Sequence, residues 1–349
     1  MTSDTRVRAL LYLAVGALIA LIAAMLSSLE PSKPKAAERV GKVVLAKFES
    51  DVTAAEEIKV TTSAGAYSLK REAEGWVLSE RGRYPVRLDA LADLSEALSS
   101  MIYTREMTRD PKKFDRLGLG DPRDDGRGAL MEVFNADGEE LAHLIVGFKN
   151  GAPYIRKPSE ELTWAVSASA FPPLQNPARW LDLDVISLST DDIARVEIEP
   201  VQDDSYALEV RRNYPGRFRL APPYDKAILL ADYAPNPPAL AMSKFSPLDV
   251  KPRSELSGAF AGNHRTITHE GLVVDIELTR EDDGSFWATL SLASETDSEE
   301  VLAQLEDIET HVAGWAFRLS RLDFNVMTTS LEDIASLKSI RRAQRQGSP

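Results

Sequence analysis

Four histidines are the residues of this 349-residue sequence that could bind a transition metal: His143, His264, His269 and His311. His269 and Glu270 begin like the His-Glu-x-x-His motif of zinc proteases, but position 273 is a valine, so the second histidine is missing. His264 and His269 lie five residues apart in a stretch predicted to be extended, which points their side chains to opposite faces. We therefore predict no metal site.

Adjacent acidic residues are the second feature that could do chemistry, and they occur as Asp124-Asp125, Asp191-Asp192, Asp203-Asp204 and Asp282-Asp283. A glycosidase needs two carboxylates that flank a cleft. These pairs instead fall at predicted turns or strand starts, where an aspartate side chain hydrogen-bonds its own backbone. The segment 282–284 could bind calcium, but it lacks a spaced acidic array with a closing glutamate. We therefore assign the pairs to turns and predict no catalytic residue.

Motifs for nucleotide binding and nucleophilic catalysis are missing from the sequence. It contains no Gly-x-x-x-x-Gly-Lys run, no Gly-x-Gly-x-x-Gly after a strand and no Gly-x-Ser-x-Gly elbow. Cysteine is absent, which excludes disulfides and thiolate chemistry. Five tryptophans could stack on sugars, but they are scattered and we expect them to pack in the core: Trp76, Trp164, Trp180, Trp287 and Trp315. We predict a protein that has no cofactor and is not an enzyme.

An apolar stretch without charges covers residues 9–29. About 20 apolar residues span the hydrocarbon core of a bilayer as a helix. A cleaved signal peptide is the alternative, with Arg6 and Arg8 as its basic start. The run is longer than a usual signal-peptide core, and no clean small-x-small cleavage site follows it. We therefore predict a single transmembrane helix that anchors the chain in the lipid bilayer.

The flanks of this helix set its orientation. Residues 1–8 form a short tail with two arginines, which favours a cytoplasmic N-terminus. Residues 30–42 also carry basic residues, but long domains are translocated largely regardless of charge. We therefore place the chain from residue 30 onward outside the cytoplasm, with 30–42 as a short stalk that contains two prolines.

The net charge of the chain is −13, from 41 basic and 54 acidic residues. Without Asp4, Arg6 and Arg8, the rest of the chain carries −14, because 39 basic and 53 acidic residues remain. Such a surface repels nucleic acid. We predict no nucleic-acid partner.

The part beyond the stalk contains an internal similarity. The segment 43–60 resembles 184–198, and Ile58 aligns with Val196 at an offset of 138 residues. Downstream, 67–79 parallels 206–220, and 113–122 parallels 244–252. Repeats of this length indicate duplicated domains, because solenoid repeats have periods of ~20–50 residues.

We therefore predict two repeat units, 43–180 and 181–338. The first strand motif recurs a third time at 325–337, so the second unit should end in a partial third strand motif. Residues 339–349 are basic and polar, and we expect them to form a loose tail.

The pattern inside each unit predicts strands, a helix, and strands again. Apolar residues alternate with charged ones around Ile58 and Val196, as half-buried strands require. One helical stripe has the spacing of three and four residues that an amphipathic helix needs, and it consists of Leu88, Leu91, Leu94, Leu98 and Ile102. Its counterpart is interrupted by Pro235, Pro237 and Pro238, which break helices. A last amphipathic helix uses Val301, Leu305, Ile308 and Val312.

The fold class that follows is α+β: two duplicated units of antiparallel strands, each with one or two packed helices, after an N-terminal transmembrane helix. Each unit should bury one face of its sheet under its helices.

Four features together resemble a bacterial family of membrane-anchored domains of unknown function. They are the N-terminal anchor, the hairpin at 65–78, the Tyr84-Pro85 pair before the leucine-rich helix, and the turn at 114–122. The resemblance covers most of 41–194. The chain departs from the family where an acidic residue often follows the Tyr-Pro stretch, because here Val86, Arg87 and Leu88 precede Asp89.

Members of that family are often encoded beside auxiliary ABC-transporter components of the gliding-motility type. The resemblance therefore implies a single-pass protein of the bacterial inner membrane, with its N-terminus in the cytoplasm and its bulk in the periplasm. It also implies a protein partner in an envelope or transporter complex. It supplies no catalytic residues.

Two hypotheses on function follow. The first is an anchored extracytoplasmic scaffold or docking protein, accessory to an ABC-transporter-type complex. The alternative is an envelope hydrolase or carbohydrate-binding protein that uses acidic residues between the two units. An enzyme needs polar residues that converge in a pocket, whereas a docking module should expose a broad, weakly polar patch.

Overall fold

The computed structural model describes residues 36–48, 52–169, 171–201, 203–212 and 214–347. The tail 1–8 and the predicted membrane segment 9–29 lie outside these residues, as does the first part of the stalk. Among the residues that are described, no helix is long and apolar enough to cross a membrane.

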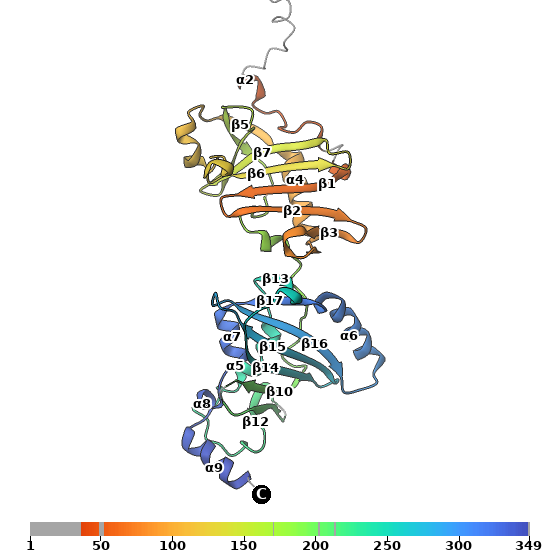
Figure 1. Cartoon of the computed structure of the whole chain (residues 1–349), viewed down its shortest axis with the longest axis vertical. Coiled ribbons are helices and arrows are strands. Elements are labelled where there is room, and N and C mark those ends of the chain that lie inside the picture. Colours follow the sequence, from red (N-terminus) through yellow and green to blue (C-terminus); the bar gives the residue numbers. More distant parts are fainter. Residues whose placement is uncertain (1–35, 49–51, 170, 202, 213, 348–349) are drawn as a thin grey trace, which may run out of the picture.

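Two antiparallel sheets follow one another along the long axis of the chain (Figure 1). With the helices that accompany them, they confirm the predicted α+β class with two units. In the described residues the first sheet has nine strands: β1 Ala55–Thr62, β2 Gly65–Glu72, β3 Gly75–Leu78, β4 Tyr84–Pro85, β5 Ile102–Glu106, β6 Ala129–Asn135, β7 Glu140–Lys149, β8 Ala152–Arg156 and β9 Thr163–Ser167.

The second sheet has eight strands within the described residues. They are β10 Ile193–Pro200, β11 Tyr206–Arg211, β12 Tyr214–Leu220, β13 Asp249–Pro252, β14 Ala259–Thr268, β15 Leu272–Arg280, β16 Phe286–Ser294 and β17 Trp315–Leu319.

The strand order of the two sheets corresponds. It is β3-β2-β1-β6-β7-β8-β9-β5 in the first sheet and β12-β11-β10-β14-β15-β16-β17-β13 in the second, and β4 extends the first. Even an irregularity recurs. The register of β1 against β6 shifts between Ala55 and Glu57, and that of β10 against β14 shifts between Ile193 and Arg195. These positions are 138 residues apart, which is the offset that aligns Ile58 with Val196.

One of the aligned segments does not correspond. The segment 113–122 follows β5, whereas 244–252 leads into β13, the counterpart of β5. The likeness of their short motifs is therefore not structural, because a lysine, a phenylalanine and a proline recur in loops of different position.

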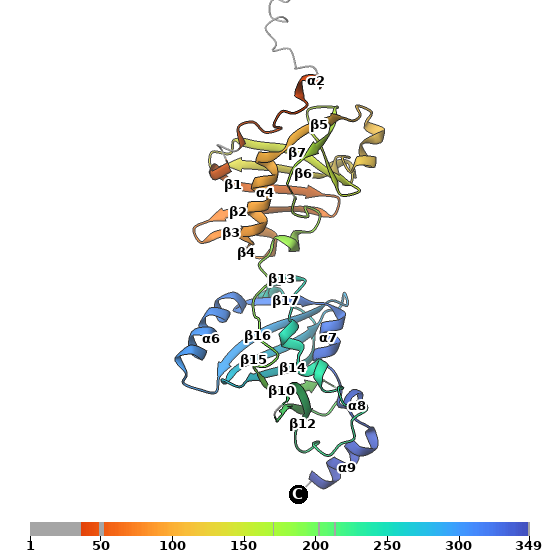
Figure 2. The same cartoon turned by 180° about the vertical axis from the view of Figure 1, so that it is seen from behind.

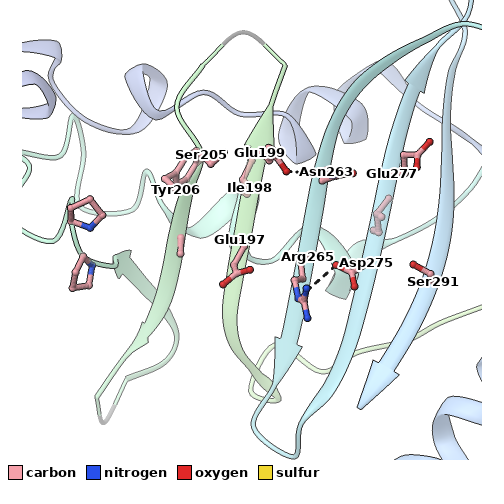
Figure 3. A pocket seen from close by; sticks show the side chains of 14 residues that line it. Glu197, Ile198, Glu199, Ser205, Tyr206, Asn263, Arg265, Asp275, Glu277 and Ser291 are labelled. Atoms are coloured by element: carbon pink, nitrogen blue, oxygen red, sulfur yellow. Dashed lines mark hydrogen bonds and ion pairs between the residues drawn. The ribbon is translucent and has the colours of Figure 1, made fainter. Parts of the chain in front are cut away.

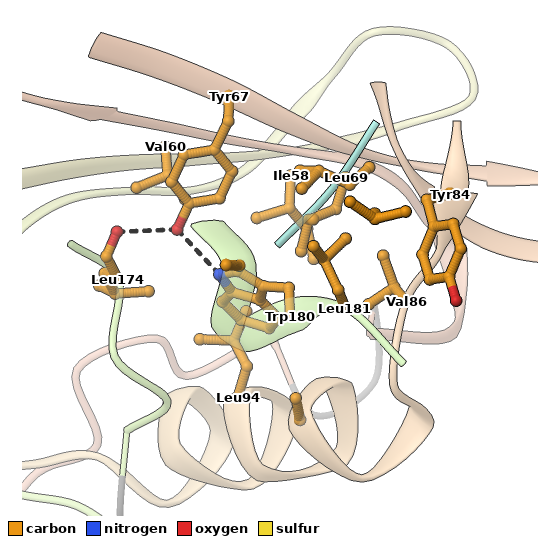
Figure 4. Packing of buried hydrophobic residues seen from close by; sticks show 14 of the residues in the cluster. Ile58, Val60, Tyr67, Leu69, Tyr84, Val86, Leu94, Leu174, Trp180 and Leu181 are labelled. Atoms are coloured by element: carbon orange, nitrogen blue, oxygen red, sulfur yellow. Dashed lines mark hydrogen bonds between the residues drawn. The ribbon is translucent and has the colours of Figure 1, made fainter. Parts of the chain in front are cut away.

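One long helix covers a face of the first sheet: α4, Leu88–Ser100 (Figure 2). Leu94 and Leu98, from the predicted stripe, are buried against the sheet. The ends of the stripe were predicted wrongly, because Leu88 is 71% exposed and Ile102 already belongs to strand β5. On the side of α4 that faces the sheet, the Tyr67 hydroxyl donates to the Leu174 carbonyl oxygen at 2.8 Å (Figure 4).

Five helices accompany the second sheet in the described residues: α5 Asn236–Ala239, α6 Glu299–Val312, α7 Arg321–Met327, α8 Leu331–Ile334 and α9 Leu337–Gly347. The predicted stripe of α6 buries Val301, Ile308 and Val312. The short α5 stands where the first unit has α4. A proline is tolerated only in the first turn of a helix, so the three prolines limit α5 to four residues.

Two segments differ from the sequence prediction. The third strand motif at 325–337 is not a strand: it holds the end of α7, all of α8 and the start of α9. The side chains of Ser330 and Asp333 form a reciprocal capping box, which favours a helix start there. Residues 339–347 of the predicted tail are not loose, because they belong to α9, which buries Ile340 and Ala343.

The described end of the stalk is attached to the first unit. Helix α2, Ala36–Arg39, is followed by backbone hydrogen bonds from Gly41 and Val44 to β5 and its neighbour Met101. The Arg39 guanidinium also pairs with Glu160 at 2.7 Å. This segment covers the otherwise open edge of the sheet, as edge strands commonly require.

The two units meet through the edge strands β4 and β13 and the adjacent β17. Arg81, in the 3₁₀ helix η2 (Ser79–Arg81), donates to both carboxylate oxygens of Asp249 at 2.7 and 2.9 Å. The ring of Tyr84 packs edge-on against Trp315, with ring centres 4.9 Å apart. Gly82 has φ +65°, and a Cβ there would lie 2.4 Å from Pro252 Cγ. The joint is therefore closely packed and needs a glycine.

Candidate functional site

An apolar groove of about 450 Å³ lies on the second unit between α5 and α7. We call this surface the apolar groove, and it is lined by Tyr233, Asn236, Pro237, Leu240, Ala241, Phe245, Leu322, Asp323, Val326 and Met327. Tyr233 is 66% exposed and Leu322 is 71% exposed, which is unusual for large apolar side chains that gather on one surface.

The proline-shortened helix explains why this groove exists. In the first unit the 13-residue α4 spans the sheet, whereas α5 ends after one turn and continues in the 3₁₀ helix η6, Ala241–Lys244. The second wall of the groove is α7, which the first unit lacks among its described elements. Leu322 and Val326 of α7 are four residues apart, so they share the face that lines the groove.

The far side of α7 is fixed to the second sheet. Phe324 stacks on Phe286 of β16 with ring centres 4.3 Å apart. Ser320 caps the helix by accepting a hydrogen bond from the Asp323 amide. The groove is therefore bounded by an anchored helix, and its apolar side chains are held in place before any partner arrives.

The polar side chains at the rim are engaged within the protein. Ser320 donates to the Asp323 carboxylate at 2.6 Å. The side-chain Oδ1 of Asn236 accepts from the Phe218 amide at 3.0 Å, which covers an edge donor of β12. Asp232 pairs with Arg211 at 2.7 Å. The groove thus offers apolar contact area and few unused hydrogen-bonding groups.

A polar hollow of about 540 Å³ lies on the solvent face of the second sheet (Figure 3). Its side chains form two rows across strands β10, β14 and β15. The first row is Glu197, Arg265 and Asp275, and the second is Glu199, Asn263 and Glu277. Each row thus places a cation or an amide between two carboxylates.

Most of the carboxylates in these rows have a partner within their own row or on the same strand. Arg265 lies 3.7 Å from Asp275, and Asn263 donates to Glu199 at 3.3 Å. Glu197 accepts from Arg195 at 2.9 Å. Such cross-strand pairs contribute ~0.2–1 kcal/mol each to a sheet. The hollow lies on one unit and not between the units, where the described contact pairs Asp249 with Arg81.

The structure does not bring the histidines together. His264 is fully buried in β14 and its Nε2 lies 2.9 Å from the Pro238 carbonyl oxygen, whereas His269 is exposed in the turn that follows. Burial lowers the pKa of His264, because the charged ring would lose its hydration. His143 contacts Glu140 at 2.9 Å, and His311 is exposed on α6. Within the described residues, no three potential ligands are grouped to hold a metal ion.

The acidic pairs lie in or beside turns, bends and one 3₁₀ helix. Asp283 accepts from the Ser285 amide at 2.8 Å, and Asp125 ends a 3₁₀ helix in the left-handed conformation. Asp203 accepts from the Leu331 amide at 3.1 Å, so it also fastens α8. These contacts give the pairs a structural role.

The tryptophans pack inside the units or at the joint. Trp164, Trp180 and Trp287 are buried, and Trp180 donates from Nε1 to the Tyr67 hydroxyl at 2.9 Å. Trp76 and Trp315 are half-buried beside the same core. The five rings therefore do not form a shared platform for a sugar.

The sequence prediction missed the apolar groove. The three prolines of 235–238 were recognised as helix breakers, but their consequence depends on what covers the sheet in place of the helix. The sequence indicated the charged rows in part, because charged residues alternate with apolar ones around Val196. The sequence pattern could not show that Glu197 and Glu199 share these rows with Asp275 and Glu277, because that depends on the order of the strands in the sheet.

A family model described as a domain of unknown function (DUF4340) matches residues 76–248. The match begins in β3 of the first unit and ends just before β13 of the second. No curated protein and no solved structure matches the chain. The predicted similarity to a domain of unknown function is thereby confirmed.

Proposed function

We propose that this protein is an extracytoplasmic scaffold that holds a partner protein in the apolar groove of its second unit. In this proposal, residues 9–29 anchor the chain in the bacterial inner membrane, with the N-terminus in the cytoplasm. The first unit spaces the second away from the membrane, and the partner belongs to an ABC-transporter-type envelope complex.

The exposed pair Tyr233 and Leu322 is the observation that carries this proposal. Tyrosine is enriched among the residues that dominate binding energy at interfaces, and such residues lie in apolar pockets that exclude water. The rim side chains are already hydrogen-bonded, so a partner would contribute apolar contacts without leaving buried donors unpaired.

The proposal includes the absence of catalytic turnover. The carboxylates of the polar hollow are exposed or paired with Arg195, Asn263 and Arg265. The histidines lie apart, and the acidic pairs are engaged in turns. These arrangements support a binding role over hydrolysis, for which two carboxylates must face a substrate across a cleft.

We also infer that the two units arose by duplication. The common strand order and the bulge at the same offset support this inference. A proline-shortened helix would then have converted the closed face of an ancestral unit into the open groove of the second.

Site-specific photocrosslinking in cells tests the docking role. A crosslinker at Leu322 or Tyr233 should capture one defined envelope protein, and one at Leu88 should not. Leu88 is a matched control because it is equally exposed, at 71%, on the first unit. Equal capture of the same protein from both units would contradict the assignment of the groove.

Complementation of a deletion strain distinguishes the two functional hypotheses. Leu322→Asp should abolish function at an unchanged protein level, whereas Glu199→Gln and Glu277→Gln should not. The opposite result would favour the hydrolase or carbohydrate-binding alternative, with the polar hollow as its site.

A reporter fused after Pro349 tests the proposed topology. It should be active outside the cytoplasm, because the short tail with Arg6 and Arg8 stays inside. Activity confined to the cytoplasm would contradict the periplasmic placement.

A further inference from the structure

Helix α9 presents a continuous basic stripe to solvent. Its exposed cations occupy positions i, i+3, i+4 and i+7 and are Lys338, Arg341, Arg342 and Arg345. The opposite side buries Ile340 and Ala343 in the core of the second unit. None of the four cations forms an ion pair with a described residue.

Helix α6 presents the opposite charge. Its exposed acidic residues are Glu299, Glu300, Glu306, Asp307 and Glu309. The helix is fixed to the unit by Val301, Ile308 and Val312. No described residue forms an ion pair with any of these five carboxylates.

Part of the charge on each helix opposes its dipole, although Glu299 and Glu300 at the start of α6 and Arg345 near the end of α9 are favourably placed. Negative charge is favourable at a helix N-terminus and unfavourable at the C-terminus, and the reverse holds for cations. Glu306, Asp307 and Glu309 lie in the last two turns of α6. Lys338 lies in the first turn of α9, where no acidic residue compensates it. The acidic C-terminal turns of α6 and the basic first turn of α9 would therefore gain from an external partner of opposite charge.

The two helices cannot satisfy one another within one chain. They lie on different sides of the second unit and are well separated in both views (Figures 1 and 2). Helix α6 packs beside β16, whereas α9 belongs to the cluster around β10 and α8. The complementary surface is available only on a second molecule.

We propose that α9 of one copy of this protein packs antiparallel against α6 of a second copy. This orientation places Lys338 and Arg341 beside the acidic C-terminal turns of α6, and Arg345 beside Glu299. At 1.5 Å per residue the basic stripe is ~10 Å long and the acidic stretch ~15 Å long, so the two overlap. Because each chain carries both helices, a two-fold pair would form the contact twice.

An anionic membrane is the other surface that a basic helix could contact. Interfacial helices insert an apolar face between lipids. The apolar face of α9 is already buried against the second unit, which leaves only electrostatic attraction. The unpaired carboxylates of α6 have no role in such binding, whereas the pairing of two copies accounts for both helices.

Charge reversal in the full-length chain tests the pairing. Sedimentation in neutral detergent should show self-association at about 50 mM salt that weakens at about 0.5 M, because exposed charges are screened. R341E/R342E should raise the dissociation constant by about tenfold or more, and E306K/D307K should do the same. The chain that combines all four changes should recover association, because the two charges have been exchanged.

Matched controls separate this contact from a general effect of charge. R116E/R179E changes the net charge equally, on exposed residues of the first unit, and should leave association unchanged. Far-ultraviolet circular dichroism should show unaltered folding in every variant, because all the changed side chains are exposed.

Several results would overturn the proposal. They are a monomer at all concentrations up to about 0.1 mM, association that is insensitive to either reversal, or no recovery in the combined chain. Vesicles with anionic lipid, mixed with the protein in neutral nanodiscs, test the other surface. If R341E/R342E abolishes vesicle binding but leaves association of copies unchanged, α9 is a lipid-binding helix and not a contact between copies.

Discussion

The two units have a common strand order but differ in what covers their sheets. In the first unit the 13-residue α4 spans one face of the sheet, whereas the second unit has the four-residue α5 and the added helix α7. Strand order is set by long-range pairing, and it persists when a helix is shortened by proline. Among the described residues, the apolar groove of the second unit holds about 450 Å³, whereas the apolar hollow beside α4 in the first holds about 240 Å³. The altered helix, and not the sheet, therefore distinguishes the surfaces of the two units.

The surfaces of the units differ as well. Residues 43–180 contain 18 basic and 22 acidic residues, a net charge of −4. Residues 181–338 contain 14 basic and 29 acidic residues, a net charge of −15. The second unit therefore carries most of the negative charge, and the cations of α9 are concentrated at its far end.

The interiors of the two sheets differ at a position that the strand register makes equivalent. Val60 of β1 is opposite Met131, whereas Ile198 of β10 is opposite His264. Both Met131 and His264 are fully buried. A buried polar residue in the second unit thus replaces an apolar one in the first.

The largest effect should come from Leu94→Asp in α4, because Leu94 is 2% exposed and the change would bury an unpaired charge. We expect a loss of more than about 4 kcal/mol from the free energy of unfolding of the first unit. Hydrogen exchange should show lost protection in residues 43–180 with the second sheet still protected. Leu88→Asp on the same helix should change stability by less than about 0.5 kcal/mol. Simultaneous loss of protection in both units would show that they fold as one.

The buried tyrosine of each unit gives the next largest contrast. Tyr67→Phe leaves two buried groups without a partner, the Leu174 carbonyl oxygen and Trp180 Nε1. Tyr206→Phe leaves only the Thr329 carbonyl oxygen. At about 1–3 kcal/mol for each unsatisfied group, the first change should cost roughly twice as much as the second. Denaturant unfolding measures both costs, and equal values would contradict the role of Trp180.

A pH dependence below about pH 6.5 should arise in the second unit from His264. The pKa of His264 is lowered by burial, so below its ordinary value of 6.5 the unfolded chain binds a proton that the folded chain does not. Stability should therefore fall as the pH drops below about 6.5, by up to about 1.4 kcal/mol per pH unit, and should not depend on this group above about 7.5.

The variant His264→Met copies the residue of the first unit and tests this dependence. It should flatten the acid limb of unfolding curves recorded between about pH 5 and 8. His311→Gln, at an exposed position, is the control and should leave the slope unchanged. A slope that persists in His264→Met would assign the dependence to another group.

The smallest effect concerns the joint between the units. The Arg81 and Asp249 side chains are 28% and 15% exposed, so solvent screens their ion pair in part. A double-mutant cycle with Arg81→Ala and Asp249→Ala should give a coupling energy of about 1 kcal/mol in thermal unfolding. Strictly additive effects would indicate that the aromatic packing of Tyr84 alone joins the units.

The local patterns of the sequence determined most of the elements. Alternation around Ile58 and Val196 identifies half-buried strands, because side chains on a strand point to the two faces in turn. The spacing of Leu91, Leu94 and Leu98 identifies α4, because residues three and four apart lie on the same face of a helix. The three prolines limit the length of α5 whatever its tertiary surroundings. The missing backbone N–H and the clash of the ring with the preceding turn are properties of proline itself.

Only the tertiary structure decided what these elements do together. The segment 325–337 has the residues of a strand motif but forms helices, because it packs on the second core and finds no strand to pair with. Residues 339–349 are too polar to predict a helix, yet two buried contacts at Ile340 and Ala343 hold α9 in place. The apolar groove and the two charged rows join residues distant in sequence, and periodicity describes only neighbours along the chain.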